Sequence, residues 1–270
     1  MENAYQLVRV FDKANKASGN LAAILFNDSE LSDLISVSTN IKKQQGIATT
    51  CFIKHFVNEQ YSVRCFNAEN EIQCCGHGML AAAKTVFLEC DISSVVINGH
   101  LIIAYDRDDK NKNYITLELP RISSMSKPLP VWLKGCVTFD GKNITPSYSA
   151  ISAESDGYLL VEFDPVLALD VFGALRLDLK QVCENTKRAV VFVQFDEEKE
   201  HLYMRYFAPQ YGVSEDSATG SVMRFVGDYI EKKYQCAHFD VSQCSSQGGF
   251  MKIKCDEEKI IITAKATIET

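Results

Sequence analysis

Residues 61–90 read YSVRCFNAENEIQCCGHGMLAAAKTVFLEC, and residues 202–230 read LYMRYFAPQYGVSEDSATGSVMRFVGDYI. In each stretch, alternating apolar residues predict a strand, a polar loop follows, and a glycine-containing turn leads into an apolar helix. The first helix, predicted over Met79–Cys90, is apolar on nearly every side, which is typical of a helix buried all round. The second is predicted over Val222–Ile230. Two units with the same order predict an internal repeat.

The repeat can be followed residue by residue along the two strands. Tyr61, Val63, Arg64, Cys65 and Phe66 correspond at one constant offset to Leu202, Met204, Arg205, Tyr206 and Phe207. Earlier in the first half we expect strands at 5–11, 21–26 and 50–54, and a helix over 31–41 with Asp28 or Ser29 as its N-cap. In the second half we expect strands at 158–163 and 189–195, with a helical stretch over 165–183 between them.

The boundary between the halves is marked by a polar segment with two prolines, SSMSKPLP at residues 123–130. We therefore predict an N-terminal domain over 1–123 and a C-terminal domain over 124–270, whose last strand is allowed to return to the first domain. Several strands together with one apolar helix in each half indicate an α+β fold. The glycine turns would bring two helix N-termini toward the interface, and their N–H groups and positive dipole ends suit a carboxylate.

Composition excludes several classes of partner. The 270 residues suit two domains, and 28 basic against 35 acidic residues give a net charge of -7, which argues against nucleic acid and anionic membranes. No apolar run approaches the ~18 residues that span a membrane, and the first residues lack a secretory signal. With 10 cysteines we therefore expect a reducing, cytoplasmic compartment and free thiols, and the cysteine and histidine spacings predict no metal site.

Four pieces of the chain resemble the PhzF-like family of phenazine-biosynthesis isomerases, which shares its fold with diaminopimelate epimerase and proline racemase. In chain order they are residues 19–24, similar to GNPAAV; residues 64–78, similar to RWFxPxxE…CGHAT; residues 205–221, similar to RYFAP…EDPATGS; and Gln247-Gly248, in the place of the family's QG. The third piece is the most specific. Order and spacing agree from about residue 7 to 265, so the resemblance covers nearly the whole chain.

The resemblance implies two similar domains, each a curved, mostly antiparallel sheet or barrel around a central helix, with the site between them. It also implies a homodimer, no metal and no organic cofactor. The implied reaction is proton transfer at a carbon next to an activating group, which in the phenazine enzyme isomerises a dihydro-hydroxyanthranilate. We therefore expect a small carboxylated metabolite as partner, and because specificity lies in loop shape, the motifs do not name it.

The chain departs from the family pattern at the position of the proton-moving glutamate. Where the family reads SETAF, residues 48–52 read ATTCF, so Thr49 replaces the glutamate. A threonine hydroxyl has no accessible anionic form near neutral pH and cannot serve as a general base unaided. Ser217 replaces the usual proline, and the arginine expected after Gln247-Gly248 is absent.

The candidate catalytic residues are His77, Asp216, Thr49 and Cys75. His77 is expected to exchange a proton with the substrate or bind it, the alternative being a histidine that satisfies a loop carbonyl. Asp216 either acts in the site, on His77 or on a proton, or caps the helix after Thr219-Gly220, and the two roles are compatible. Cys75 lies where racemases of this fold carry a cysteine, and a thiol at a helix start can have a lowered pKa. Its facing position, about Ser217, cannot mirror it, which favours a small buried residue packing a tight turn.

The candidate substrate-binding residues are Asn20, Gly76, Gly78, Thr219, Gly220 and Ser221. The hydroxyls and N–H groups around Thr219 and Ser221 suit a carboxylate, and the alternative is ordinary helix capping. Asn20 is expected in a turn with Gly19, with a ligand contact. Glu71 is expected to be structural, because the family also has an acid there.

Two functions of different class follow. The first is a cofactor-independent isomerase or epimerase in which His77 and Asp216 handle protons, with side chains within about 10 Å of each other in one cleft. The second is a pseudoenzyme of the same fold that binds a metabolite or a protein partner. Thr49 is the residue that keeps both open, since a glutamate there would favour the enzyme.

Overall fold

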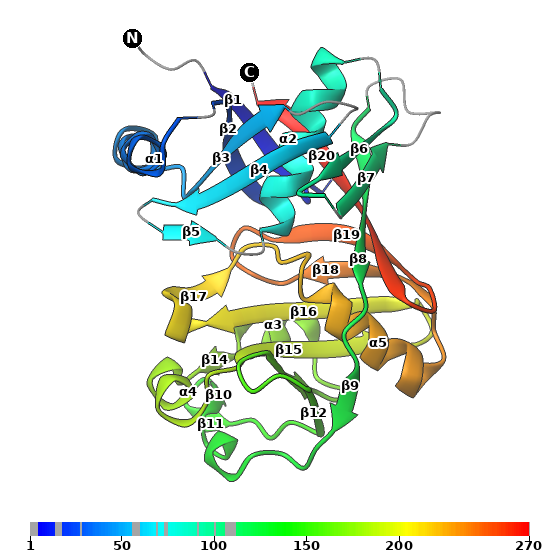
Figure 1. Ribbon diagram of the computed structural model, residues 1–270. Coiled ribbons are helices and arrows are strands. Elements are labelled where there is room, and N and C mark those ends of the chain that lie inside the picture. Colours follow the sequence, from blue (N-terminus) through cyan, green and yellow to red (C-terminus); the bar gives the residue numbers. More distant parts are fainter. Residues whose placement is uncertain are drawn as a thin grey trace. The chain divides into compact units, whose positions relative to one another are not determined.

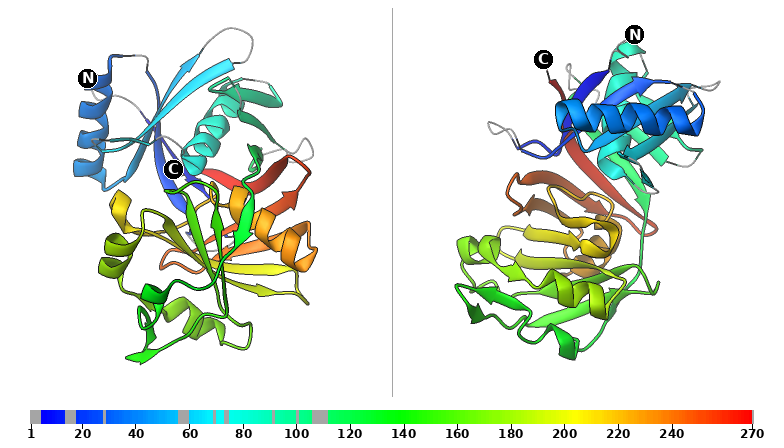
Figure 2. Two further views of the ribbon diagram at one scale, coloured as in Figure 1. Left: turned by 60° about the horizontal axis from the view of Figure 1, so that its bottom comes forward. Right: turned by 90° about the vertical axis from the view of Figure 1, so that its left-hand side faces the viewer.

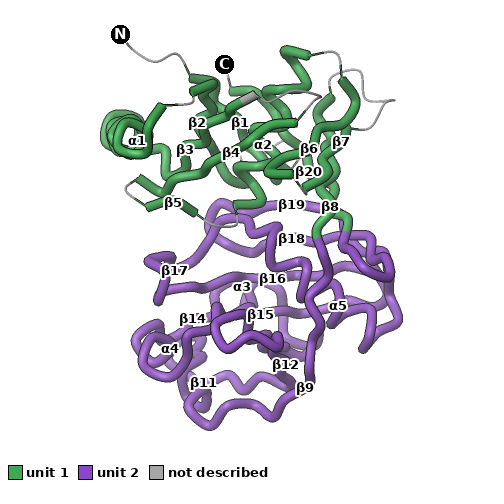
Figure 3. The backbone as a smooth tube through the Cα atoms, in the orientation of Figure 1, with its two compact units in different colours: residues 1–119, 261–270 green, residues 120–260 purple. Residues whose placement is uncertain are grey.

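The computed structural model describes residues 5–13, 18–27, 29–55, 60–68, 70–72, 75–90, 92–99, 101–105 and 112–269. The chain forms two compact units (Figure 3). Unit 1 comprises Met1–Leu119 together with Ile261–Thr270, and unit 2 comprises Pro120–Ile260. The chain therefore leaves unit 1 after Leu119 and returns to it after Ile260.

Unit 1 is a sheet closed around one helix (Figure 1). Its strands are β1 (Gln6–Val10), β2 (Asn20–Phe26), β3 (Thr49–His55), β4 (Gln60–Asn67), β5 (Asn70–Ile72), β6 (Ser94–Ile97), β7 (Leu101–Tyr105), β8 (Tyr114–Pro120) and β20 (Lys259–Glu269), and its helices are α1 (Leu31–Gln45) and α2 (Gly76–Glu89). The pairs β1–β2, β3–β4, β6–β7 and β7–β8 are antiparallel, whereas β2–β3 and β4–β6 are parallel. Because β20 pairs with both β1 and β8, no edge is left between the first and last strands.

The central helix of unit 1 is α2, which contacts strands β1 to β4, β6 and β7. Nearly every residue from Gly76 to Phe87 is buried, so the expectation of an apolar helix buried all round is confirmed. The helix begins at Gly76, three residues before the predicted start. His77 and Gly78 therefore belong to its first turn and not to a preceding loop.

The other helix, α1, covers the opposite face of strands β2 and β3, as both views in Figure 2 show. Its buried Leu34 and Ile41 pack with Phe52 and Phe66. The predicted N-cap is wrong where it can be checked: the cap is Glu30, with no side-chain hydrogen bond, and not Ser29. Asp28 lies outside the described residues.

Unit 2 repeats this arrangement and contains additional short strands and helices. Its strands are β9 (Ser124–Ser126), β10 (Val137–Phe139), β11 (Lys142–Asn143), β12 (Tyr148–Ser152), β13 (Tyr158–Glu162), β14 (Arg176–Leu177), β15 (Ala189–Asp196), β16 (His201–Ala208), β17 (Val213–Asp216), β18 (His238–Gln243) and β19 (Gly249–Cys255). Its helices are α3 (Leu169–Ala174), α4 (Leu179–Asn185) and α5 (Met223–Tyr234), with 3-10 turns at Val131–Leu133 and Pro209–Tyr211.

The strand pairings show that the two units share one topology. In unit 2, β12–β13 and β15–β16 are antiparallel and β13–β15 and β16–β18 are parallel, the same sequence of pairings as β1 to β6 in unit 1. The short strand β17 follows β16 as β5 follows β4, and each leads into a buried helix. The predicted α+β fold of two similar sheet-around-helix domains is confirmed.

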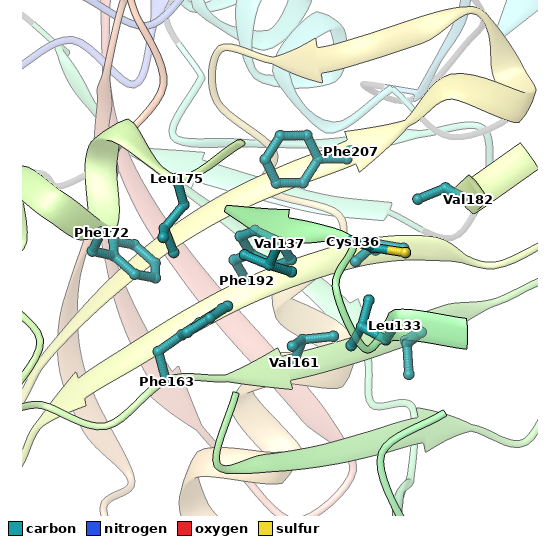
Figure 4. Packing of buried hydrophobic residues seen from close by; sticks show 12 residues of the cluster. Leu133, Cys136, Val137, Val161, Phe163, Phe172, Leu175, Val182, Phe192 and Phe207 are labelled. Atoms are coloured by element: carbon teal, nitrogen blue, oxygen red, sulfur yellow. The ribbon is translucent and has the colours of Figure 1, made fainter. Parts of the chain in front are cut away.

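The segment between β13 and β15 packs on the sheet of unit 2 through a cluster of buried apolar residues (Figure 4). Phe163 contacts Phe172 and Phe192 edge to face at centroid distances of 5.9 and 5.0 Å, and Phe192 contacts Phe207 in the same way at 5.0 Å. These rings fix the segment between β13 and β15 on the sheet face. No helix of the described residues is long and apolar enough to cross a membrane.

Two sequence predictions in these connections are wrong in detail. The stretch 165–183 is not one helix, because the strand β14 separates α3 from α4 and pairs with β10. Asp178 then starts α4 by accepting a hydrogen bond from the Gln181 N–H at 3.1 Å. The loops expected after β4 and β16 contain the short strands β5 and β17.

An arginine–glutamate pair recurs at the same place in both units. Arg64 donates Nε and Nη2 hydrogen bonds to Glu71 at 2.8 and 2.7 Å, and Arg205 donates to Glu215 at 2.7 and 2.9 Å. Each guanidinium also lies over the phenylalanine two residues later, 5.4 and 5.0 Å from the ring centroid. Each pair ties a short strand to its neighbour, and the expected structural role of Glu71 agrees with this geometry.

The two pairs differ in burial, which predicts different costs of removal. The side chain of Arg205 is 9% exposed and also donates to the Leu175 carbonyl at 2.5 Å, whereas that of Arg64 is 35% exposed. Arg205→Ala should lower the free energy of unfolding by about 3 kcal/mol, because it leaves the half-buried Glu215 carboxylate and the Leu175 carbonyl without their hydrogen-bond donor. Arg64→Ala should cost about 1 kcal/mol or less. Urea denaturation measures both, and equal losses would contradict this account.

Candidate active site

The start of α2 carries three of the predicted residues of unit 1. Cys75 is the N-cap, with φ -115° and ψ 82° and no side-chain capping hydrogen bond. The first amide to bond within the helix is that of Met79, which donates to the Cys75 carbonyl at 3.0 Å. The N–H groups of Gly76, His77 and Gly78 therefore precede the first intrahelical bond, at the end of the helix where the dipole favours an anion.

Three thiols meet at Gly78. The sulfurs of Cys51 and Cys65 are 3.0 Å apart, and Cys65 also hydrogen-bonds Cys75. A Cβ added at Gly78 would lie 2.6, 2.7 and 2.9 Å from the sulfurs of Cys51, Cys65 and Cys75. Only glycine therefore lets the first turn of α2 pack this closely against β3 and β4.

The environment of Cys75 does not produce a thiolate. Its hydrogen bond with Cys65 and its burial raise the pKa of the Cys75 thiol well above the ordinary value, although nearby His77, with a ring nitrogen 3.7 Å from the sulfur, acts in the opposite direction. A thiol with a raised pKa is protonated at neutral pH and is a poor base. This favours packing of a tight turn as the role of Cys75.

Thr49 and Asn20 stand at the starts of neighbouring strands. Thr49 opens β3, is 6% exposed, and points to the same sheet face as Cys51 two residues later, which is the face that carries α2. Gly19 has φ +76°, and a Cβ there would lie 2.1 Å from the Val10 carbonyl oxygen, so the expected turn requires glycine. Asn20 follows as the first residue of β2 and is largely buried.

The predicted residues of unit 2 lie in the loop between β17 and α5. Asp216 ends β17, and its carboxylate accepts a hydrogen bond from the Thr219 hydroxyl at 2.5 Å. The predicted capping role of Asp216 is wrong, because α5 has Val222 as its N-cap with no side-chain hydrogen bond. Asp216 instead folds the loop onto itself.

A residue that the sequence did not point to, Gln243, holds this loop in place. Its Oε1 accepts from the Thr219 N–H at 2.7 Å, and its Nε2 donates to the Asp216 carbonyl at 2.6 Å. Gln243 is buried at the end of β18, on the face where Phe239 and Val241 are also buried. A polar residue at an apolar register position was the available signal.

The neighbouring serines add further ties. Ser217 Oγ donates to Gln247 Oε1 at 2.9 Å, and Ser245 Oγ donates to the Ser217 carbonyl at 2.7 Å. By contrast, the N–H groups of Gly220 and Ser221 donate to no acceptor among residues 112–269 or the other described ranges. Hydrogen bonds from several residues thus hold the loop, and its two adjacent amide donors, which have no acceptor within the described ranges, suit an anion.

The predicted site residues therefore gather in two places, one in each unit. Thr49, Cys75, Gly76, His77 and Gly78 surround the start of α2, and Asp216, Thr219, Gly220 and Ser221 form the loop before α5. The separation between the side chains of His77 and Asp216 stays a prediction. In the part of the chain that is described, no group of three or more His, Cys, Asp or Glu side chains is arranged to hold a metal ion.

Comparison with known proteins identifies relatives over nearly the whole chain. The profile of the family described as "Phenazine biosynthesis-like protein" matches residues 8–269. An uncharacterized isomerase of Vibrio cholerae is 29% identical over 254 residues, covering 93% of this chain and 84% of the relative.

Solved structures agree on the fold. A PhzF-family phenazine biosynthesis protein of Enterococcus faecalis superposes with a TM-score of 0.79 at 20% identity, over 98% of this chain and 96% of that one. A hydroxyproline epimerase of Agrobacterium vitis, solved with bound trans-4-hydroxy-L-proline, superposes with a TM-score of 0.60 at 8% identity, over 100% of this chain and 92% of that one. The fold is thus shared by proteins named for isomerase and epimerase reactions.

Substitution of Gly78 tests the packing of the candidate site. Gly78→Ala should lower the free energy of unfolding by about 1–3 kcal/mol, because the new methyl group must displace three buried sulfurs. Gly173→Ala is the matched control: Gly173 also lies in a helix, nothing lies within 4 Å of an added Cβ, and the change should stabilise by up to about 1 kcal/mol. Thermal unfolding measures both. A Gly78→Ala variant as stable as wild type would show that the turn accommodates a side chain.

Proposed function

The chain belongs to the phenazine biosynthesis-like protein family, and from this we propose that it is a cofactor-independent isomerase or epimerase that moves a proton on a small carboxylated metabolite, cyclic or amino-acid-like. The isomerase names of its curated relatives support the reaction class. The substrate itself is set by loop shape and not by the shared motifs.

The observation that carries the proposal is the loop of residues 216–221. The N–H groups of Gly220 and Ser221 have no acceptor among the described residues, and the Ser221 hydroxyl stands beside them. Gln243 and Asp216 hold the loop fixed through Thr219. Donors that are already oriented bind a carboxylate without a cost of reorganisation, and they also stabilise an enolate-like charge as it forms.

In the proposed reaction, His77 and Asp216 handle the proton. One of them takes the proton from the carbon next to the activating group, and the electron pair of the C–H bond is delocalised into that group. A protonated partner then returns a proton to the carbon skeleton, so that no net charge is gained or lost. The proposal requires both side chains to reach one substrate.

Thr49 favours a second candidate, a pseudoenzyme that keeps the carboxylate site. The residue lies on the sheet face that carries α2, where the family glutamate would stand, and its hydroxyl cannot act as a general base unaided. Loss of a general base typically costs about 100- to 10,000-fold in rate. Binding would then persist while turnover is low.

We also propose a homodimer, as the resemblance implies, and a cytoplasmic location, as the 10 cysteines indicate. Sedimentation velocity at micromolar concentration checks the first point, and particles with the mass of a single chain alone would contradict it.

The proposal predicts a gain of function at position 49. Thr49→Glu should increase deuterium uptake from deuterated water by about 100-fold or more, because it supplies the missing carboxylate base. Proton NMR with a panel of dihydroaromatic and amino-acid carboxylates measures the uptake. Thr49→Gln is the matched control, since it has the same size without the charge. Equal uptake by wild type and Thr49→Glu would show that another residue is the base, with His77 and Asp216 next to be tested.

Binding is measured separately, so that a missing base and a missing site can be distinguished. Ser221→Ala should weaken carboxylate binding about tenfold or more, because a hydrogen bond to a charged group is lost. Ser214→Ala, at an exposed position of β17, should have no effect. If neither wild type nor Thr49→Glu binds any carboxylate in an NMR titration, the carboxylate site is refuted.

A further inference from the structure

Cys51 and Cys65 are two thiols that lie directly opposite each other on neighbouring strands. They face each other in the antiparallel pairing of β3 with β4, and their sulfurs are 3.0 Å apart. Both side chains are buried, at 0% and 1% exposure. Neither is needed for the proton transfer described above.

The backbone geometry at this pair is that of a disulfide. Directly opposed residues of antiparallel strands have Cα atoms about 4.5–5.5 Å apart, within the 4.4–6.8 Å range over which disulfides form. The sulfurs need to approach by only ~1 Å to reach the bond length of about 2.05 Å. We propose that Cys51 and Cys65 are a redox-active pair that is oxidised reversibly to an intramolecular disulfide linking β3 to β4.

The third thiol of the cluster, Cys75, does not compete equally. It belongs to the first turn of α2 and not to a strand, so its position relative to Cys65 is not set by a ladder of backbone hydrogen bonds. In the described ranges, no group of three or more His, Cys, Asp or Glu side chains is arranged to hold a metal ion. The cross-strand bond is therefore the expected product.

The oxidation balances with a low-molecular-weight disulfide as oxidant. A thiolate of the pair attacks one sulfur of the reagent, which releases one reagent thiol and forms a mixed disulfide. The second protein thiol then attacks the protein sulfur of the mixed disulfide, which forms the Cys51–Cys65 bond and releases the second reagent thiol. Two S–H bonds are lost by the protein and two are gained by the reagent.

The environment makes this exchange slow. Burial raises the pKa of the Cys51 thiol, and the hydrogen bond with Cys51 raises that of Cys65 well above the ordinary value. Thiolate is therefore scarce at neutral pH, and the reagent must enter through a local opening of the fold. Both redox forms should persist for long enough to be separated and compared.

The bond would also change stability. It closes a loop of about 15 residues, and in the chain-entropy account such a closure raises the midpoint of thermal unfolding by roughly 5–10 °C in a protein of this size. The bond would also lie next to the candidate site. Cys51 is two residues after Thr49 in β3, and Cys65 hydrogen-bonds Cys75, the N-cap of α2.

The full chain is incubated in glutathione buffers of increasing oxidised fraction, both as the native protein and during refolding from denaturant, so that slow entry does not limit the result. After acid quenching and alkylation, peptide mapping by mass spectrometry should show a Cys51–Cys65 cross-link that reductant reverses, with a higher unfolding midpoint. Cys51→Ser and Cys65→Ser should each abolish the cross-link. Cys75→Ser and Cys183→Ser, the latter at an exposed thiol, should leave it intact.

Three results would overturn the proposal. The first is a pair that stays reduced in both arms while exposed Cys183 is modified by glutathione. The second is a cross-link of Cys65 to Cys75 in place of Cys51. The third is a metal ion retained by the reduced protein in native mass spectrometry and lost in Cys51→Ser, which would make the thiols ligands.

Discussion

The close approach of α2 to strands β3 and β4 at Gly78 is the constraint on which the first half of this protein depends. An apolar helix can be surrounded by a closed sheet only if its first turn fits between the strands, and three sulfurs already occupy the space around the Gly78 Cα. The same contact fixes where the N–H groups before Met79 point. Packing and the candidate anion site are therefore one feature, since the glycine that permits the helix to dock also places its open end.

In the second half, a hydrogen-bond network holds the segment before the helix in place, whereas close packing does so in the first half. The loop before α5 is held by the buried amide of Gln243, which pairs with Thr219 and Asp216, and by the hydrogen bond from the Thr219 hydroxyl to the Asp216 carboxylate. A fully satisfied buried amide specifies one loop conformation, at the cost of depending on every partner. Two copies of one topology thus reach a rigid helix start by different physical means.

Local patterns in the sequence predicted most of this fold. The all-round apolar character of residues 79–87 predicted a buried helix, and the alternation around Arg64 and Arg205 predicted the paired strands. What could not be predicted depends on partners distant in sequence. Arg176-Leu177 forms a strand because β10 lies beside it, which no helical periodicity over 165–183 reveals. In the site, the motifs pointed to His77, Asp216 and Ser221. Gln243 stood out in the sequence only as a polar residue at an apolar register position, and its partners are identified only once β18 is placed beside the loop.

The return of the last strand to unit 1 has a consequence for how the protein is made. Leu7 pairs with Glu269 and Val10 with Ala266. The pairing of β1 with β20 can therefore form only after residues up to 269 have been synthesised. Unit 2, by contrast, is one continuous segment, Pro120–Ile260. During synthesis the N-terminal half emerges first yet finishes last, and contacts of such high sequence separation form slowly. Until β20 has left the ribosome, the edges of β1 and β8 that it covers remain open to other chains, and the nascent protein is exposed to misassembly at these two strands.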